Sequence, residues 1–305
     1  MTTILTGTCS WTDPTLVACG RFYPRPSMSA EERLRFYASQ FPVVEVDSTY
    51  YSPPSERNAV LWAQRTPDDY VFDVKAFAML TGHGARPDRL PPALRERLRD
   101  PGRATPDGGR TRNVYLKDLT PDGADALWEI HRRALAPLRS AGKLGAVLFQ
   151  FPPWFHRSRE NAAYLQTLRR GLPEDTIAVE FRGGGWMEAD AADATLALLE
   201  REGLAYVSVD EPQGFRSSTP PLTAVTAELA YVRFHGRNSA TWDAQTPAAS
   251  DRFNYLYEQS ELEEWAPRIR RLASTARSVH VLFNNNYEDV GVRNARQMAL
   301  LLTSD

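Results

Sequence analysis

The sequence predicts a closed (β/α)8 barrel, a TIM-barrel-like α/β fold formed by a single domain over residues 1–305, with a long irregular insertion after the third strand. Eight short strand-like segments occur, and helical patterns separate most of them. This alternation indicates a parallel sheet, and eight units favour a closed barrel over an open, doubly wound sheet. No glycine-rich phosphate fingerprint follows the first strand, so a dinucleotide-binding fold is not indicated.

The N-terminal third supplies three strands and two helices. Gly7 and Trp11 are interpreted as the end of the first strand, and a proline-bearing loop follows. Ser29, with Glu32 three residues later, forms a capping-box signature at the start of the first helix. The predicted strands are 4–8, 43–47 and 70–75, and the predicted helices are 30–39 and 55–65.

The insertion covers about residues 78–117 and is rich in Pro, Gly and Arg. It holds eight arginines against four acidic residues, with at most a short helix at 93–98. A segment of this length inside a compact domain usually forms a lid or an irregular loop. We expect residues from about Gly82 to Arg112 to form an irregular or mobile flap near the barrel mouth.

The C-terminal part returns to regular alternation. Between the sixth and seventh strands the chain is rich in proline and shows no convincing helix. The predicted strands are 145–150, 176–182, 205–210, the stretch from 231 to the break at Gly236, and 279–284. The predicted helices are 122–140, 161–170, 189–202, 261–276 and 291–302.

The seventh strand gives the clearest indication of where a functional site lies. Val232 and Phe234 share one face, whereas Tyr231, Arg233 and His235 share the other. Two or more ionisable groups on one face are too many for a sealed core unless they are paired or line a site. We therefore expect this strand to open into a polar cavity at its C-terminal end, where (β/α)8 barrels place their chemistry.

The other strands also end in polar residues, and we expect these to share one rim. The strand-end residues are Ser10, Trp11, Glu45, Asp47, Asp73, Lys75, Gln150, Glu180, Arg182, Asp210, Arg233, His235, Arg237, Asn284, Asn285 and Asn286. The pairs Asp73 with Lys75 and Glu180 with Arg182 have an alternative interpretation as structural ion pairs.

These residue types indicate acid–base chemistry on an anion. The proton-transfer candidates are Glu180, His235, Glu45 and Asp210. The candidates for holding an anion are Lys75, Arg182, Arg233 and Arg237. Further substrate contacts are expected from Trp11, Tyr50, Gln150, Asn284 and Asn285. The loop aromatics Trp11, Tyr50, Tyr51, Trp154 and Trp186 could form a wall around a ring-bearing ligand or plug the top of the barrel.

No metal or other cofactor is expected at this site. The chain has neither HxH nor HExxH spacing. The alternative is a single divalent ion held by His235 with Glu45, Glu180 and Asp210. The remaining histidines are not associated with the strand ends; they are His83, His131, His156 and His280.

Composition restricts partners and compartment. The net charge of -2 argues against a surface built for duplex DNA, so nucleic acid is a possible but not a favoured partner. No apolar run approaches the roughly 18 residues of a membrane helix, and no signal peptide is evident. We therefore expect a cytoplasmic protein in which Cys9 and Cys19 are reduced. Cys9, in a strand-end loop, could be reactive or simply a small turn residue.

Several ordered motifs resemble the YecE-like family, a TIM-barrel-like family of unknown function (DUF seventy-two). They are Gly7-Thr8-Cys9-Ser10-Trp11, Phe22-Tyr23-Pro24, Val44-Glu45-Val46-Asp47-Ser48-Thr49-Tyr50-Tyr51, Phe72-Asp73-Val74-Lys75, Phe149-Gln150-Phe151-Pro152-Pro153, Val179-Glu180-Phe181-Arg182, Tyr231-Val232-Arg233-Phe234-His235-Gly236-Arg237 and Phe283-Asn284-Asn285-Asn286. Two positions depart from the family pattern: Cys9-Ser10 stands where Ser-Gly is common, and Asp47 stands where Asn is common.

The resemblance supplies no established reaction. It implies similarity to endonuclease-IV-like and xylose-isomerase-like barrels, and hence DNA or sugar phosphates as ligands. Such nucleases use a multi-histidine, multi-metal centre, whereas only His235 lies at a strand end here. We therefore expect an enzyme that acts on a small anionic, phosphorylated or sugar-like substrate at the C-terminal mouth, with the hydrolase, lyase and isomerase classes open. The alternatives are a nucleic-acid-binding or endonuclease-IV-like DNA-processing barrel, and a non-catalytic binding protein. The oligomeric state is also open.

Overall fold

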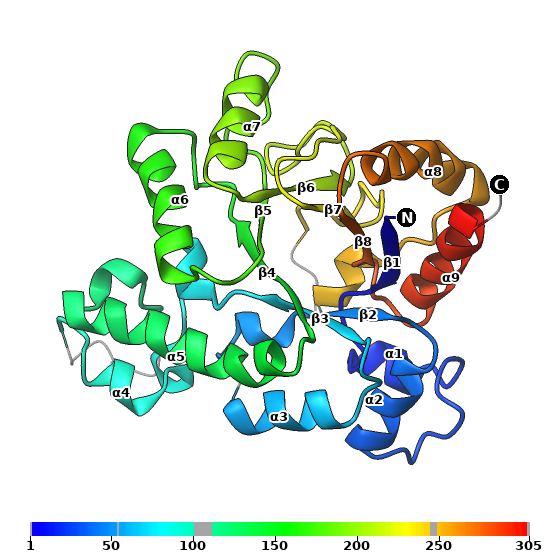
Figure 1. Ribbon diagram of the computed structural model, residues 1–305, viewed down its shortest axis with the longest axis horizontal. Coiled ribbons are helices and arrows are strands. Elements are labelled where there is room, and N and C mark those ends of the chain that lie inside the picture. Colours follow the sequence, from blue (N-terminus) through cyan, green and yellow to red (C-terminus); the bar gives the residue numbers. More distant parts are fainter. Residues whose placement is uncertain (1, 54, 101–111, 245–248, 304–305) are drawn as a thin grey trace.

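The computed structural model describes residues 2–53, 55–100, 112–244 and 249–303. Its strands form a closed parallel barrel in the order β1 to β8, as the sequence predicts (Figure 1). Each strand pairs with the next along the chain, and β8 pairs with β1. The strands are β1 (Thr3–Thr8), β2 (Val43–Val46), β3 (Val71–Lys75), β4 (Leu144–Phe151), β5 (Ile177–Phe181), β6 (Ala205–Asp210), β7 (Leu229–Phe234) and β8 (Ser278–Phe283).

Helices surround the barrel (Figure 1). They are α1 (Pro14–Ala18), α2 (Ala30–Ala38), α3 (Glu56–Gln64), α4 (Pro92–Arg95), α5 (Pro121–Ser140), α6 (Arg159–Gly171), α7 (Ala192–Arg201), α8 (Gln259–Ala273) and α9 (Val290–Thr303). The predicted capping box is present, because Ser29 and Glu32 bond each other's backbone N–H groups. The short helix α1 was not predicted. It begins where Asp13 accepts from the N–H of Thr15, and five residues are too few to show a helical period.

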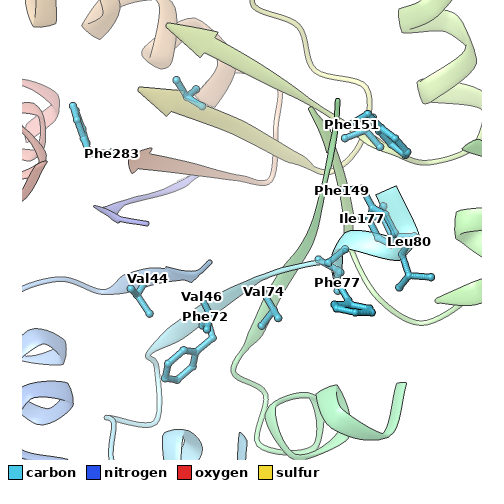
Figure 2. Packing of buried hydrophobic residues seen from close by; sticks show 14 of the residues in the cluster. Val44, Val46, Phe72, Val74, Phe77, Leu80, Phe149, Phe151, Ile177 and Phe283 are labelled. Atoms are coloured by element: carbon cyan, nitrogen blue, oxygen red, sulfur yellow. The ribbon is translucent and has the colours of Figure 1, made fainter. Parts of the chain in front are cut away.

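Side chains alternate between the inside and the outside of the barrel along each strand, and this separates two apolar regions. Outward-facing strand side chains pack against the helices, and Figure 2 shows part of this layer, including Val44, Phe72, Phe149 and Phe283. Inward-facing apolar residues are smaller on average and form a second cluster that includes Cys9, Ala146 and Ala178. Charged residues share this interior: Asp73 pairs with His280 at 2.9 Å, not with Lys75. The sequence did not indicate this contact of His280 with Asp73.

Gly7 lies within β1 and does not end it. A Cβ at this position would lie 2.1 Å from the carbonyl oxygen of Val43. Glycine is therefore required by the close approach of β1 and β2, not by a turn.

The insertion after β3 is irregular, as predicted, but its described parts are packed into the protein. Its short elements are η2 (Ala78–Thr81), η3 (Pro87–Arg89), α4 and η5 (Leu116–Asp118). Phe77 and Leu80 join the main core (Figure 2), and isolated bridges join Ala85 to Val114 and Leu98 to Leu119. Residues 101–111 of the predicted flap lie outside the described residues.

Two further features concern helices. Residues 211–228, between β6 and β7, contain no helix, in agreement with the proline-rich sequence. Within the described ranges, no helix combines the length and apolar character needed to cross a membrane.

Candidate active site

Arg233 lies at the centre of the barrel and is 0% exposed. Its Nε and Nη2 donate to the two carboxylate oxygens of Glu45 at 2.9 and 2.7 Å. Its Nη1 donates to Glu180 at 2.5 Å, so one guanidinium joins β7 to β2 and β5. Tyr231 also donates to Glu45, at 3.0 Å. The guanidinium charge is thus offset by two buried carboxylates.

Glu180 remains ionised near neutrality. Burial by itself would raise the pKa of Glu180, but Arg233 and His235 hold it well below its usual value. Burial likewise opposes the charge of Arg233, yet Glu180 and Glu45 raise the pKa of its guanidinium well above the usual value. The network therefore carries fixed charges, which makes Glu180 a poor proton donor at neutral pH.

His235 is neutral in this network. Burial lowers its pKa to about 3, although Glu180 favours the charged form. An imidazole that donates from Nε2 to Glu180 at 3.0 Å and accepts at Nδ1 from Asn284 at 2.9 Å satisfies both contacts. His235 therefore acts as a hydrogen-bonding link between Glu180 and Asn284.

Gln150 links this buried network to Lys75. Its amide donates to Glu180 at 2.6 Å, while its carbonyl oxygen accepts from the Lys75 ammonium at 2.8 Å. The ammonium also lies 5.0 Å from the ring centroid of Tyr50. Burial, followed by the charge of Arg233, lowers the pKa of Lys75.

Above the network is a cavity of about 710 Å³ at the C-terminal ends of the strands, which we call the central cavity. Lys75, Gln150 and Asn284 form part of its lining, whereas Glu45, Glu180, Arg233 and His235 do not reach it. Its lining residues are Ser10, Thr12, Asp13, Pro14, Thr15, Asp47, Ser48, Tyr51, Lys75, His83, Gln150, Pro152, Pro153, Trp154, Arg182, Ser217, Trp242, Asp243, Arg252, Phe253, Asn284 and Asn286.

Asp47 lines the central cavity and has a shifted pKa. Burial raises its pKa to about 7; Lys75 acts against this rise and Glu45 adds to it. Within the described ranges, no donor forms a hydrogen bond with its carboxylate oxygens. A carboxyl group that titrates near neutrality in a cavity is suited to exchanging protons with a ligand.

Arg182 is a further cation of the lining, beside Lys75 and Arg252. Its Nη1 lies 3.0 Å from Glu211 and 3.4 Å from Glu180, and its guanidinium stacks 4.5 Å from the ring centroid of Trp242. Burial raises the pKa of Glu211 to about 7, opposed by the charge of Arg182. The Glu180–Arg182 contact is therefore part of a larger network that reaches the central cavity.

The loop aromatics are divided between two places. Tyr51 and Trp154 line the central cavity, and Tyr50 contacts Lys75 beside it. Trp11 packs against Trp62 and Phe72 in the outer core. Trp186 stacks on Phe155 and Phe181 there. The outward packing of the two buried tryptophans means that the structure does not bring them to the ligand space.

Asp210 and Arg237 also lie away from the central cavity. Asp210 faces outward from β6, where Trp265 and Tyr257 donate to its carboxylate at 2.7 and 2.6 Å. Arg237 lies beyond the Gly236 break and bonds Asp210, Glu261 and Glu264. The expectation that Glu45, Glu180, Asp210 and His235 share one cavity was therefore wrong, because Asp210 faces the helices together with Arg237 and the other three lie beneath the central cavity without lining it. In β6 the apolar Val207 and Val209 face inward.

Two further candidates, Asn285 and Cys9, lie outside the lining of the central cavity. Asn285 is buried and donates to Tyr255 O and to Asn294, so it supports the loop after β8. Cys9 is buried beside Arg233, and burial raises the pKa of its thiol well above the usual value, which is opposite to the shift that activates a nucleophile. Cys9 and Cys19 are both free thiols.

A divalent ion does not fit the proposed ligand set. Arg233 already occupies the position between Glu45 and Glu180, and Asp210 faces away from them. In the part of the chain that the structure describes, no group of three His, Cys, Asp or Glu side chains could hold a metal ion.

Comparison with known proteins agrees with this fold. The family described as protein of unknown function DUF72 matches residues 5–305. The chain belongs to the DUF72 family. The UPF0759 protein YunF of Bacillus subtilis (strain 168) is 32% identical over 284 residues, which cover 92% of this chain and 89% of that protein. The resemblance inferred from the ordered motifs is thus confirmed.

Two crystal structures of DUF72 family proteins have the same architecture. The protein from Thermotoga maritima MSB8 is 28% identical, with a TM-score of 0.75 and coverage of 98% of this chain and 99% of that one. The protein from Enterococcus faecalis V583 is 25% identical, with a TM-score of 0.76 and coverage of 99% and 96%. These relatives establish the family and the fold.

Sequence reasoning missed several residues of the central cavity. Trp242 and Phe253 come from the long connection after β7, where no periodic pattern indicated a direction. His83, thought unrelated to the site, lies in its lining. Glu211 follows β6 directly and contacts Arg182. Its position directly after a strand could have indicated a site residue. The sequence analysis assigned proton transfer to the neighbouring Asp210 instead.

Proposed function

We propose that this protein is an enzyme that binds a small anionic, sugar-like substrate in the central cavity and exchanges a proton with it through Asp47. The main support is that Lys75, Arg182 and Asp47 line one cavity. The carboxylates beneath it, Glu45 and Glu180, are already paired with Arg233. Two cations and one titratable carboxyl group in a single cavity form the minimum set for anion binding with acid–base chemistry.

Lys75 and Arg182 are the proposed anion ligands. The Lys75 ammonium forms a hydrogen bond with Gln150 and keeps other N–H groups for a ligand. The carboxylate contacts of Arg182 all use Nη1, and within the described ranges its Nε and Nη2 form no hydrogen bond. A phosphate or carboxylate can therefore be held without breaking either contact.

The sequence candidates Glu45, Glu180 and His235 take a supporting role in this proposal. These side chains hold one another in place: Arg233 donates to Glu180, and Glu180 also accepts a hydrogen bond from Gln150 above it. Gln150 and Asn284 then present their amides to the cavity in defined orientations. Proton transfer is assigned to Asp47, because the pKa of His235 is too low, at about 3, for it to accept a proton near neutrality.

The rest of the lining favours a ring-bearing substrate. Trp242 covers one face of Arg182, and Trp154 lines the same cavity. Flat apolar faces next to cations and carboxylates fit a hydroxyl-bearing ring with an anionic substituent. The two free cysteines suit a protein of the reducing cytoplasm, where we place this enzyme.

The test has a binding arm and a turnover arm. In the binding arm, sodium phosphate at pH 6 should raise the melting temperature more than sodium chloride at equal ionic strength. Binding to the native state contributes about 2.7 kcal/mol at a hundredfold excess over Kd. Lys75→Gln and Arg182→Gln should lose most of this gain. Arg170→Gln, which removes an exposed arginine on α6, should keep it.

In the turnover arm, a panel of sugar phosphates is screened for a reaction catalysed by the purified protein. Asp47→Asn should reduce kcat about 100-fold or more, with KM changed less than about threefold. Asparagine is nearly isosteric with aspartate but cannot exchange a proton. Equal effects of phosphate and chloride would remove the anion site. Phosphate binding without turnover across the panel would leave a non-catalytic binding protein.

A further inference from the structure

Two further cavities adjoin the central cavity along the rim of the barrel. The first, of about 680 Å³, shares Ser48 and Tyr51 with it. The second, of about 540 Å³, shares Pro153 and Trp154 with it. The central cavity therefore lies between two flanking cavities, and each junction is marked by shared lining residues.

An exposed aromatic side chain stands at each junction. Tyr51 is 60% exposed and Trp154 is 58% exposed, whereas most aromatic residues of this protein are buried or half-buried. Trp154 is held by a hydrogen bond to Gly82 O at 3.3 Å and by an edge contact with His83. Tyr51 is held by an edge contact with Tyr50. Exposed but supported rings at the mouth of a cavity are suited to stacking on a ligand.

Each flanking cavity also carries an exposed arginine. Arg89 lines the cavity beside Tyr51, and Arg216 lines the cavity beside Trp154. Within the described ranges, neither side chain forms an ion pair or a hydrogen bond. Arg86, by contrast, is neutralised by Asp88 at 2.8 Å. An unpaired guanidinium on each side of the centre provides two further positions for anionic groups.

We infer that the ligand is an acidic oligosaccharide of at least three sugar units, which crosses the mouth and stacks on Tyr51 and Trp154. The inference rests on the proposed function, because the central unit would occupy the cavity of Lys75, Arg182 and Asp47. The flanking units would lie in the two adjoining cavities, with their anionic groups near Arg89 and Arg216. Chemistry would then occur at an internal unit of the chain.

The lining favours an acidic sugar over single-stranded nucleic acid. Asp13, Asp47 and Asp243 line the central cavity together with its cations. Carboxylates accept hydrogen bonds from the hydroxyl groups that sugar units carry, whereas phosphodiesters offer no such donors. Single-strand binders instead combine aromatic platforms with a groove of predominantly positive charge.

The experiment measures affinity against chain length by calorimetry at constant ionic strength. The probes are oligogalacturonides, hyaluronan oligosaccharides and heparin oligosaccharides, from the shortest unit to five or six sugars. A neutral malto-oligosaccharide series and a thymidine oligonucleotide series are run beside them. In at least one acidic series, affinity should rise about tenfold or more when the chain reaches three units, and then level off.

The variants test which residues produce the length dependence. Tyr51→Ala and Trp154→Ala should remove most of the gain in affinity between the shortest unit and three units, while Tyr51→Phe and Trp154→Phe should keep it. Arg89→Ala and Arg216→Ala should weaken only the longer acidic chains. Arg170→Ala is the matched control and should change nothing.

The outcomes separate the two proposals. Phosphate binding that depends on Lys75, with no length gain in any acidic series, would overturn the extended ligand and leave the proposed function intact. Loss of phosphate binding and of all sugar binding would end both. A larger length gain for thymidine oligonucleotides, lost in the same aromatic variants, would overturn the sugar in favour of single-stranded nucleic acid.

Discussion

Arg233 shows how one side chain can determine the interior of a barrel. A guanidinium has five N–H donors in a rigid plane, and here the plane spans two glutamates on different strands. The pattern of β7 indicates that this residue faces inward, but not which partners neutralise it. Those partners come from positions 188 and 53 residues away in the chain.

Because Arg233 binds two carboxylates, even a conservative substitution of it should lower stability strongly. Arg233→Lys keeps the charge but replaces the planar fork with one ammonium, which cannot serve Glu45 and Glu180 together. We expect the free energy of unfolding to fall by about 3–5 kcal/mol, the usual cost of leaving a buried charge unpaired. Urea denaturation measures this loss.

A second substitution tests the cause. Adding Glu45→Gln to Arg233→Lys removes the carboxylate left without a partner, so the double variant should recover part of the loss. Arg170→Lys, at an exposed site on α6, should change stability by less than about 0.5 kcal/mol. Strictly additive effects of the two buried substitutions would contradict the pairing.

At the level of elements, β6 is the strand whose direction could not be taken from its sequence. Polar and apolar residues alternate along β6, but alternation does not say which set faces the axis. Trp265 of α8 and Tyr257 before that helix decide the matter, because both donate to Asp210 on the outer face. Arg237 joins the same contacts and connects the loop after β7 to α8.

From these contacts we predict that Arg237 stabilises the fold and does not bind the anion. Arg237→Gln loses its contacts with Asp210, Glu261 and Glu264, and we expect a loss of about 1–3 kcal/mol, because the side chain is partly exposed. The rise in melting temperature with phosphate should remain that of the unmodified protein. A phosphate effect abolished in Arg237→Gln would return this residue to the anion site.

At the level of the whole molecule, the sequence predicted the barrel and part of the rim, because βα alternation and strand parity are local patterns. It also predicted Lys75, Gln150, Arg182 and Asn284 as cavity residues. It could not predict Trp242 or the flanking cavities, since these depend on how long, non-periodic loops fold back over the rim. Nor could it show that Asp47 receives no hydrogen bond from the residues that the structure describes.

The histidines make the molecule less stable in acid. Burial lowers the pKa of His131 and His83 to about 4, and that of His235 to about 3. In the unfolded chain all three take up protons below about pH 6.5, whereas the folded protein does not until the pH reaches these lower values. Their contribution to stability is therefore present above about pH 6.5 and is lost as the pH falls.

Asp47 and Glu211 act in the opposite direction, and the balance gives the last prediction. Burial raises the pKa of each to about 7, so their contribution is present at low pH and is lost as the pH rises through 7. Each group changes the free energy of unfolding by about 1.4 kcal/mol per pH unit in the range where only one state binds its proton. The three histidines raise stability with pH and the two carboxyl groups lower it, so stability should have a shallow maximum between about pH 6 and 7. The double variant Asp47→Asn/Glu211→Gln lacks the opposing groups. Its free energy of unfolding, measured in urea, should rise steeply from pH 5 and show no decline up to pH 8. Parallel pH profiles for the two proteins would show that these carboxyl groups titrate normally, and Asp47 would lose its claim to proton transfer.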